Sequence, residues 1–161
     1  MSNIPNADIV LDIINKYVPE VIQTMAGLSA VPGKGDTQAP QPATLSGVAG
    51  AIGLTGRANG VVYTAFSENL AFMVAEKILG DKPSDQDMSD VVAELTNMIT
   101  GNVKSQLCDR GYNCSLSIPS VVRGDKITVA AKSAAISVRN EYLCEGCDGL
   151  LVLQVFAVLE K

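Results

Sequence analysis

The segment from Asp90 to Leu107 predicts an amphipathic helix. At about 100° per residue, one broad apolar face contains Val91, Val92, Leu95, Met98, Ile99 and Val103. A separate polar strip contains Asp90, Glu94, Asn97, Gly101 and Lys104. Glu94 and Asn97 are three residues apart, so their side chains are neighbours on the helix surface. A glycine inside a helix costs about 1 kcal/mol relative to alanine, which suggests that Gly101 leaves room for something to approach. We therefore expect this strip to be a docking or catalytic surface.

Helical periodicity also extends over residues 6–25, with Asn6 or Asp8 available as a cap. Pro19 should kink or split this helix, because proline removes a backbone donor. The next segment, residues 27–43, is rich in Gly and Pro. This composition predicts a loop or a mobile connector.

Further along the chain, the pattern predicts two strands at residues 45–54 and 60–66, joined as a hairpin. Ser67 then caps a helix that ends at Leu79, and Gly80 follows in the position that glycine favours. Ser84, Asp85, Asp87 and Ser89 are candidate caps for the helix described above. After Leu107 the apolar residues alternate, which predicts strands near residues 113–118, 127–131, 134–138 and 150–159. This order favours an α+β fold with helices packed on a mostly antiparallel sheet.

Length and charge limit the possible functions. The 161 residues fit a single domain over 1–161, and the hydrophobic content of 47% is typical of a globular protein. A formal net charge of −5 argues against nucleic-acid binding. No apolar stretch reaches the roughly 18–20 residues that span a bilayer, and the first ten residues lack the pattern of a secretory signal. We expect a cytoplasmic location without membrane contact.

The residue types present restrict the chemistry. The chain has no histidine, so catalysis would depend on carboxylates, amides, Lys, Ser, Thr or Cys. No glycine-rich phosphate loop is found. Cys144 and Cys147 form a CxxC beside a predicted turn at Asp148-Gly149, but Cys108 and Cys114 have the wrong spacing for a second zinc-binding pair. We expect reduced thiols, with a metal or redox role as the alternative.

Two segments together resemble the CheC/CheX/FliM-type phosphatase superfamily. Residues 53–80 are similar to its unit of glycine, strand, acidic residue, "LA", helix and "LG". The spacing Asp90-x-x-x-Glu94-x-x-Asn97, followed by Gly101, resembles the signature of the chemotaxis phosphatases CheX and CheC, and Pro119 supplies the later proline of that pattern. The motif occurs once, as in CheX, whereas CheC-like proteins carry two copies.

The resemblance implies hydrolysis of the aspartyl phosphate on a CheY-type response regulator. Asn97 would orient the attacking water, because an amide both donates and accepts hydrogen bonds. Glu94 would pair with the regulator's lysine, since an exposed carboxylate is a poor base at neutral pH. Asp90, Gly101 and Lys104 would lie at the partner surface, with Asp90 also complementing the helix dipole. The protein would need no cofactor of its own, because Mg²⁺ would come from the regulator.

The resemblance also implies a homodimer formed through sheet edges. Residues 150–159 could be a central strand or such an edge. A non-catalytic docking module is the alternative function, as in the flagellar-switch relatives that share this fold. The Glu-x-x-Asn pair is the feature that favours the phosphatase.

Overall fold

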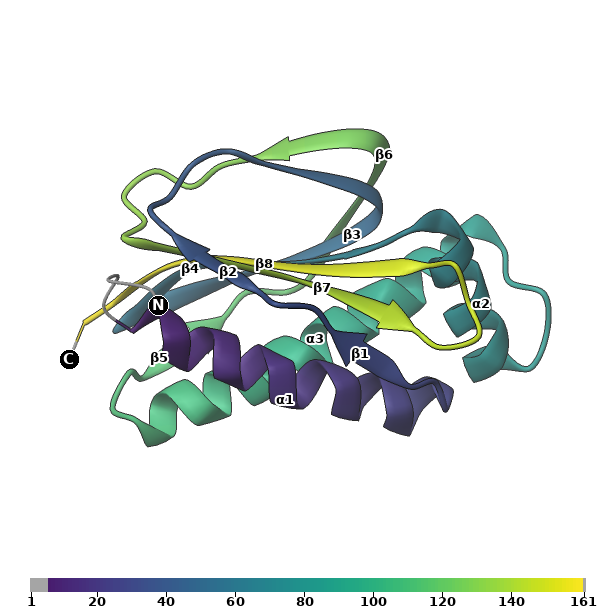
Figure 1. Cartoon of the computed structure of the whole chain (residues 1–161), viewed down its shortest axis with the longest axis horizontal. Coiled ribbons are helices and arrows are strands. Elements are labelled where there is room, and N and C mark those ends of the chain that lie inside the picture. Colours follow the sequence, from purple (N-terminus) through teal and green to yellow (C-terminus); the bar gives the residue numbers. More distant parts are fainter. Residues whose placement is uncertain (1–5, 161) are drawn as a thin grey trace.

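A computed structural model describes residues 6–160, in which the helices pack against one face of an antiparallel sheet (Figure 1). The elements, in chain order, are α1 (Ala7–Ala26), β1 (Ala30–Pro32), β2 (Asp36–Gln38), β3 (Ala43–Gly56), β4 (Ala58–Phe66), α2 (Glu68–Leu79), α3 (Asp85–Asp109), β5 (Cys114–Leu116), β6 (Ser120–Val129), β7 (Ile136–Cys144) and β8 (Leu150–Leu159). This confirms the predicted α+β fold.

The sheet has the order β1-β7-β8-β4-β3-β5, while β2 also pairs with β7 and β6 also pairs with β3. Every pairing between these strands is antiparallel. The strand β8 lies between β7 and β4, so it is a central strand and not an edge. Residues on both faces of β8 are buried, which explains its nearly unbroken apolar sequence.

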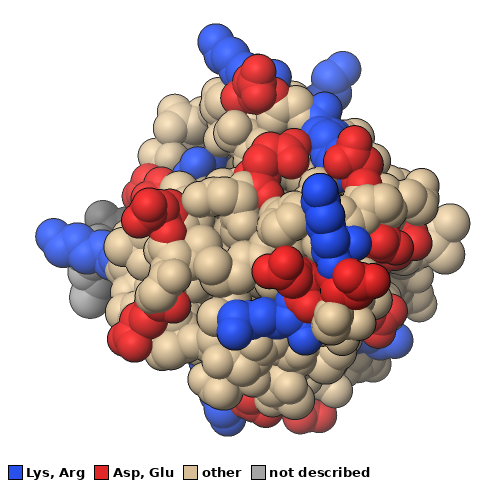
Figure 2. All heavy atoms as spheres, turned by 90° about the vertical axis from the view of Figure 1, so that its right-hand side faces the viewer, with Lys and Arg blue, Asp and Glu red and all other residues tan. Residues whose placement is uncertain are grey.

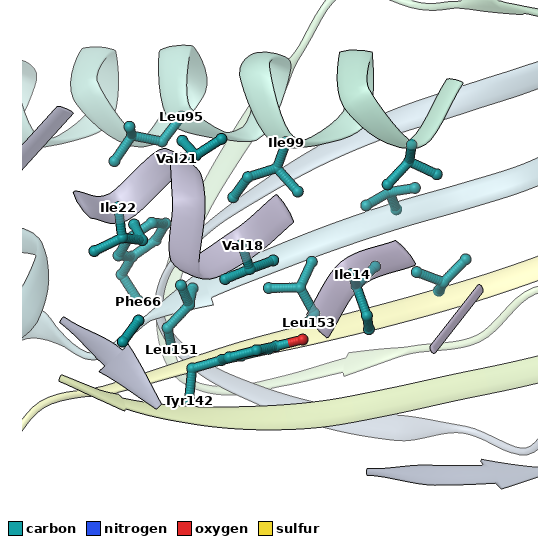
Figure 3. Close-up of a cluster of buried hydrophobic side chains, with 14 of the residues drawn as sticks. Ile14, Val18, Val21, Ile22, Phe66, Leu95, Ile99, Tyr142, Leu151 and Leu153 are labelled. Atoms are coloured by element: carbon teal, nitrogen blue, oxygen red, sulfur yellow. The ribbon is translucent and has the colours of Figure 1, made fainter. Parts of the chain in front are cut away.

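The main hydrophobic core lies between the helices and the sheet (Figure 3). Figure 3 shows side chains of α1 and α3 directed toward those of β4, β7 and β8; the labelled residues are Ile14, Val18, Val21, Ile22, Phe66, Leu95, Ile99, Tyr142, Leu151 and Leu153. A smaller cluster on the opposite face includes Leu45, Val129, Val152 and Phe156, and Ile127 of β6 packs against it. The sheet is therefore covered on both faces. Helices cover one side, and the paired strands β3 and β6 cover the other.

The prediction for residues 27–43 is wrong in part. Two short strands, β1 and β2, form there and pair with β7 in place of a structureless loop. The backbone amide of Gly33 donates to Glu141 O at 2.7 Å, which ties the connection between the two strands to β7. The glycines and prolines indicated a loop, but the neighbouring edge of β7 supplies hydrogen-bond partners that the local sequence does not reveal.

The helix α1 continues through Pro19 without splitting. Buried residues on both sides of the proline, Val18, Val21 and Ile22 among them, hold the two parts of the helix on the same core. Asn6 is the N-cap residue, as predicted, but it adopts a left-handed conformation with φ of 70° and its side chain makes no capping hydrogen bond. Packing therefore stabilises this end of the helix in place of a side-chain cap.

The other predicted elements are present, with some differences in extent. The hairpin of β3 and β4, the helix α2 with Gly80 at its C-terminal end, and β8 are all confirmed. Ser67 is the N-cap of α2, but its hydroxyl donates to Asn69 Oδ1 and accepts from Leu150 N instead of capping the helix. The strand β6 begins directly after Pro119, earlier than the alternation at residues 127–131 suggested.

The helix α3 approaches the sheet most closely at Gly50 of β3. A Cβ atom on Gly50 would lie 2.9 Å from Cβ of Thr96, so only glycine fits at this point. Thr96 is fully buried, and its hydroxyl donates to Val92 O at 2.6 Å. Because that proton is used, the Thr64 hydroxyl of β4 must donate to Thr96 Oγ1 in the hydrogen bond between the two threonines. These contacts set the height and rotation of α3 on the sheet.

We predict that Gly50→Ala lowers the free energy of unfolding by about 1–3 kcal/mol, because the added methyl group overlaps Thr96. Gly53→Ala on the same strand is the matched control, since the nearest atom to its new Cβ would be Ser117 Oγ at 3.6 Å. Urea unfolding of both variants measures the difference. An equal effect of the two substitutions would contradict the close approach of α3 at Gly50.

Candidate functional site

The candidate site lies on α3, whose beginning is defined by a capping box. Ser84 Oγ accepts from Asp87 N at 3.1 Å, and Asp87 Oδ2 accepts from Ser84 N at 2.9 Å. Ser84 is one of the four predicted caps, and the helix therefore starts one turn earlier than the apolar periodicity alone indicated. The predicted apolar face is confirmed: all its members are buried except Met98, which is half-buried.

Glu94 and Asn97 both lie on the exposed side of α3. Their side chains make no hydrogen bond or ion pair with other residues in the range 6–160. Leu95 and Thr96, between them, are fully buried, so the helix rotation fixed by Thr96 turns Glu94 and Asn97 outward. The structure thus brings a carboxylate and an amide together on an accessible surface.

Gly101 continues this strip with open space above it. A Cβ atom built on Gly101 has no heavy atom within 4 Å outside the helix backbone. The glycine is therefore not required by internal packing, in contrast to Gly50. This agrees with the expectation that room is left beside Glu94 and Asn97.

Asp90 and Lys104 lie at the two ends of the strip. Asp90 is exposed and its Oδ1 accepts from Gln86 Nε2 at 2.8 Å, one turn earlier on the same helix. Lys104 is half-buried. Burial raises the pKa of the Cys114 thiol of β5, and the positive charge of Lys104 lowers it by a smaller amount.

Arg123 of β6 connects the starts of two helices beside this strip. Its guanidinium lies 3.4 Å from Glu68 Oε1 at the start of α2 and 3.4 Å from Asp85 Oδ1 at the start of α3. Both pairs are partly exposed, so their contribution to stability is small. Figure 2 shows acidic and basic side chains interspersed over the end of the molecule where α2 lies, without one continuous basic area.

The cysteines show no sign of an assembled metal or redox site. Among the residues described, no group of three or more His, Cys, Asp and Glu side chains could hold a metal ion. All four cysteines are free, and burial raises the pKa of Cys144, with its neighbour Cys147 adding to the effect. A raised pKa keeps this thiol protonated and unreactive at neutral pH. Cys144 ends β7, and Cys147 follows a turn at Glu145 and Gly146, slightly earlier than the turn predicted at Asp148-Gly149.

Sequence reasoning identified the outward strip but missed the residues that hold it in place. Gly50, Thr64 and Thr96 belong to different elements, and nothing in their spacing connects them. The run of small residues in β3 is the one signal that could have indicated a close helix approach. Arg123 was likewise not predicted to join α2 and α3.

Known proteins resemble this chain in both sequence and structure. The family model described as chemotaxis phosphatase CheX matches residues 48–141. A CheC-like superfamily protein from Shewanella sp. PV-4 is similar in structure, with a TM-score of 0.76 and 31% identity over 98% of this chain and 99% of that chain. Chemotaxis protein CheX from Vibrio vulnificus has a TM-score of 0.82 and 26% identity over 92% of this chain and 99% of that chain.

A more distant likeness concerns the fold alone. The CheX–CheY–BeF₃–Mg²⁺ complex from Borrelia burgdorferi contains a chain with a TM-score of 0.71 and 20% identity, covering 98% of this chain and 100% of that chain. A comparison with curated proteins finds no match. Within residues 6–160, the helices lack the combined length and apolar character required to cross a membrane.

We predict that Gly101→Ala raises the free energy of unfolding by about 0.5–1 kcal/mol, because alanine is the better helix former and its methyl group meets no obstacle. Gly80→Ala is the contrasting control. Gly80 also has open space around it, but its φ of 75° is left-handed. The substitution Gly80→Ala should therefore lower the free energy of unfolding by about 1–2 kcal/mol. Thermal and urea unfolding measure both changes, and a destabilised Gly101→Ala would show that packing requires this glycine.

Proposed function

Because this chain belongs to the CheX family of chemotaxis phosphatases, matching its model over residues 48–141, we propose that it hydrolyses the aspartyl phosphate of a CheY-type response regulator. The observation that carries the proposal is the exposure of Glu94 and Asn97 together, one turn apart, on an accessible face of α3 with open space at Gly101. A partner protein can reach both side chains without any change in this chain.

An acyl phosphate is already reactive, so the enzyme must mainly place a water molecule in line with the bond that breaks. Asn97 is suited to this task. Its amide oxygen accepts a hydrogen bond from the water while its NH₂ group donates to a phosphoryl oxygen or to the regulator. The absence of histidine from the chain is compatible with this chemistry, because no strong general base is required.

Glu94 is assigned to docking. Its carboxylate has no partner among residues 6–160, and a lysine in the regulator's active site would supply one through a charge-assisted hydrogen bond. Such a pair sets the register between the two proteins and brings Asn97 over the phosphoryl group. The Mg²⁺ ion would be held by the active site of the regulator and not by this chain.

The other residues of the strip have supporting roles in this proposal. Gly101 permits close approach of the partner backbone. Asp90 lies at the N-terminal end of the strip and Lys104 at the other, so they bracket the contact surface. The CheX–CheY complex from Borrelia burgdorferi, in which a protein of the same fold is bound to CheY, supports a CheY-type regulator as the partner.

A homodimer is part of the proposal and concerns the sheet edges. Since β8 is central, it cannot supply the pairing edge. Within the described chain, β6 pairs with β3 on one side only, and Val122 on this strand is 47% exposed. The long outer edge of β6 is the better candidate for pairing with a second copy.

We predict that Asn97→Ala reduces regulator dephosphorylation roughly hundredfold, because a correctly oriented water is lost. The measurement is loss of phosphate from a regulator charged with acetyl phosphate or by its kinase. Gln23→Ala, which removes an exposed amide from α1, is the matched control and should remain active. Circular dichroism checks that both variants fold.

The result also separates the phosphatase from the docking module. If wild-type protein binds the phosphorylated regulator but leaves its rate of phosphate loss unchanged, the docking function is correct and the catalytic one is wrong. If Asn97→Ala is as active as the wild type, the role assigned to Asn97 is wrong.

Glu94→Gln should lower kcat/KM roughly tenfold to hundredfold, mainly through a higher KM, since a hydrogen bond to a charged group contributes about 1.5–3 kcal/mol. The effect should shrink at high salt, where the charge of the wild-type pair is screened. Glu76→Gln, an exposed glutamate of α2, is the control. A loss confined to kcat would contradict the docking role of Glu94.

A further inference from the structure

Residues 33–44 form a strap that the proposed function does not use. This strap lies outside the part of the chain that matches the family model. It begins at Gly33, whose carbonyl accepts from Asn140 Nδ2 at 3.2 Å, and it includes β2, which pairs with β7 at residues 137–139. Two cavities, of 320 and 250 Å³, lie along it, and Arg139 of β7 lines both.

The alternation of β7 places Arg139 away from the helices. Asn140 and Tyr142 point toward α1, where Asn15 Oδ1 accepts a hydrogen bond from each of them at 2.7 Å. Val138 belongs to the same core. Residues 137 and 139 therefore face the opposite side of the sheet, where Gln38, Gln41 and Thr44 of the strap line the smaller cavity with them.

The guanidinium of Arg139 has no hydrogen-bond or ion-pair partner within residues 6–160. Its Nη1 atom is buried, and no acceptor within residues 6–160 lies at hydrogen-bond distance. Asp36 is the cross-strand neighbour of Arg139, yet the two side chains form no ion pair. A buried cationic nitrogen without an acceptor is costly, so an acceptor from outside the chain would stabilise this position.

The smaller cavity offers the better surroundings for a negative group. Arg139 is the one charged residue in its lining, and the others are Gln38, Gln41, Pro42, Ala43, Thr44, Ser137 and Gln154. Gln154 is 1% exposed and donates to Ser137 Oγ at 2.9 Å, which leaves the Ser137 hydroxyl proton available to a ligand. In the larger cavity, the charges of Asp36 and Glu141 offset those of Lys34 and Arg139, so it attracts an anion less.

We propose that the 250 Å³ cavity beside Arg139 binds a small molecule through an oxyanion, either a carboxylate or a phosphate. The guanidinium presents two parallel N–H groups that match two oxygens of such an anion. The amides and hydroxyls of the strap and of β8 contact the rest of the molecule. This site lies on the opposite face of the sheet from α3 and does not depend on the phosphatase proposal.

The test is an NMR titration of the full-length protein with inorganic phosphate and, separately, with malonate, at constant ionic strength. We expect saturable shifts confined to the side-chain amides of Gln38, Gln41 and Gln154, the Arg139 Nε–H and neighbouring backbone amides. The stronger of the two probes identifies the preferred oxyanion. If neither probe gives saturable shifts there, or the shifts scatter over the whole surface, the proposal is wrong.

Arg139→Gln should weaken the binding roughly tenfold or more, because a charge-assisted bidentate contact is lost. Arg139→Lys keeps the positive charge but loses the two parallel N–H donors of the guanidinium, so it should give an intermediate affinity. Arg57→Gln removes an exposed arginine from the β3–β4 connection and should bind like the wild type. Unaltered binding by both Arg139 variants would overturn the assignment even where the wild-type titration is saturable.

Discussion

The contact of α3 with the sheet at Gly50 decides which residues of this helix reach solvent. Thr96 is held between the Gly50 backbone and the Thr64 hydroxyl, and it lies between Glu94 and Asn97 in the sequence. A helix turns by about 100° per residue, so with both Leu95 and Thr96 held in the core, Glu94 and Asn97 lie on the exposed side. The candidate site is therefore a consequence of how one buried polar residue is packed.

Such a site needs few groups of its own. An exposed carboxylate and amide on a rigid helix cannot by themselves polarise a stable substrate, and the chain contains no histidine to help them. They are sufficient when the partner supplies a reactive bond and the strongest charges, which is the situation in a phosphorylated response regulator. The pair lies on a helix that is held by the core. This gives Glu94 and Asn97 the positional accuracy that the proposed phosphate hydrolysis requires.

How much could be predicted from the sequence depended on whether the signal was local. The face of α3, the Gly80 end of α2 and the extent of β8 could be predicted because periodicity and capping act within one segment. The strands β1 and β2 could not, since their hydrogen-bond partners lie about 100 residues or more away on β7. For the same reason, the outward pair was visible in the sequence while its support by Gly50 and Thr64 was not.

The two faces of the sheet differ in the kind of surface they produce. On the helix side, a large apolar cluster lies between the helices and the sheet, and the proposed phosphatase site is on the exposed side of α3. On the other side, the apolar cluster is small and β7 and β8 contribute Ser137, Arg139 and Gln154 next to the strap. Polar residues at these positions cost stability in a sheet interior unless something satisfies them. Gln154 donates to Ser137, whereas the buried Nη1 of Arg139 has no acceptor among residues 6–160, and that difference makes the arginine the informative residue on this face.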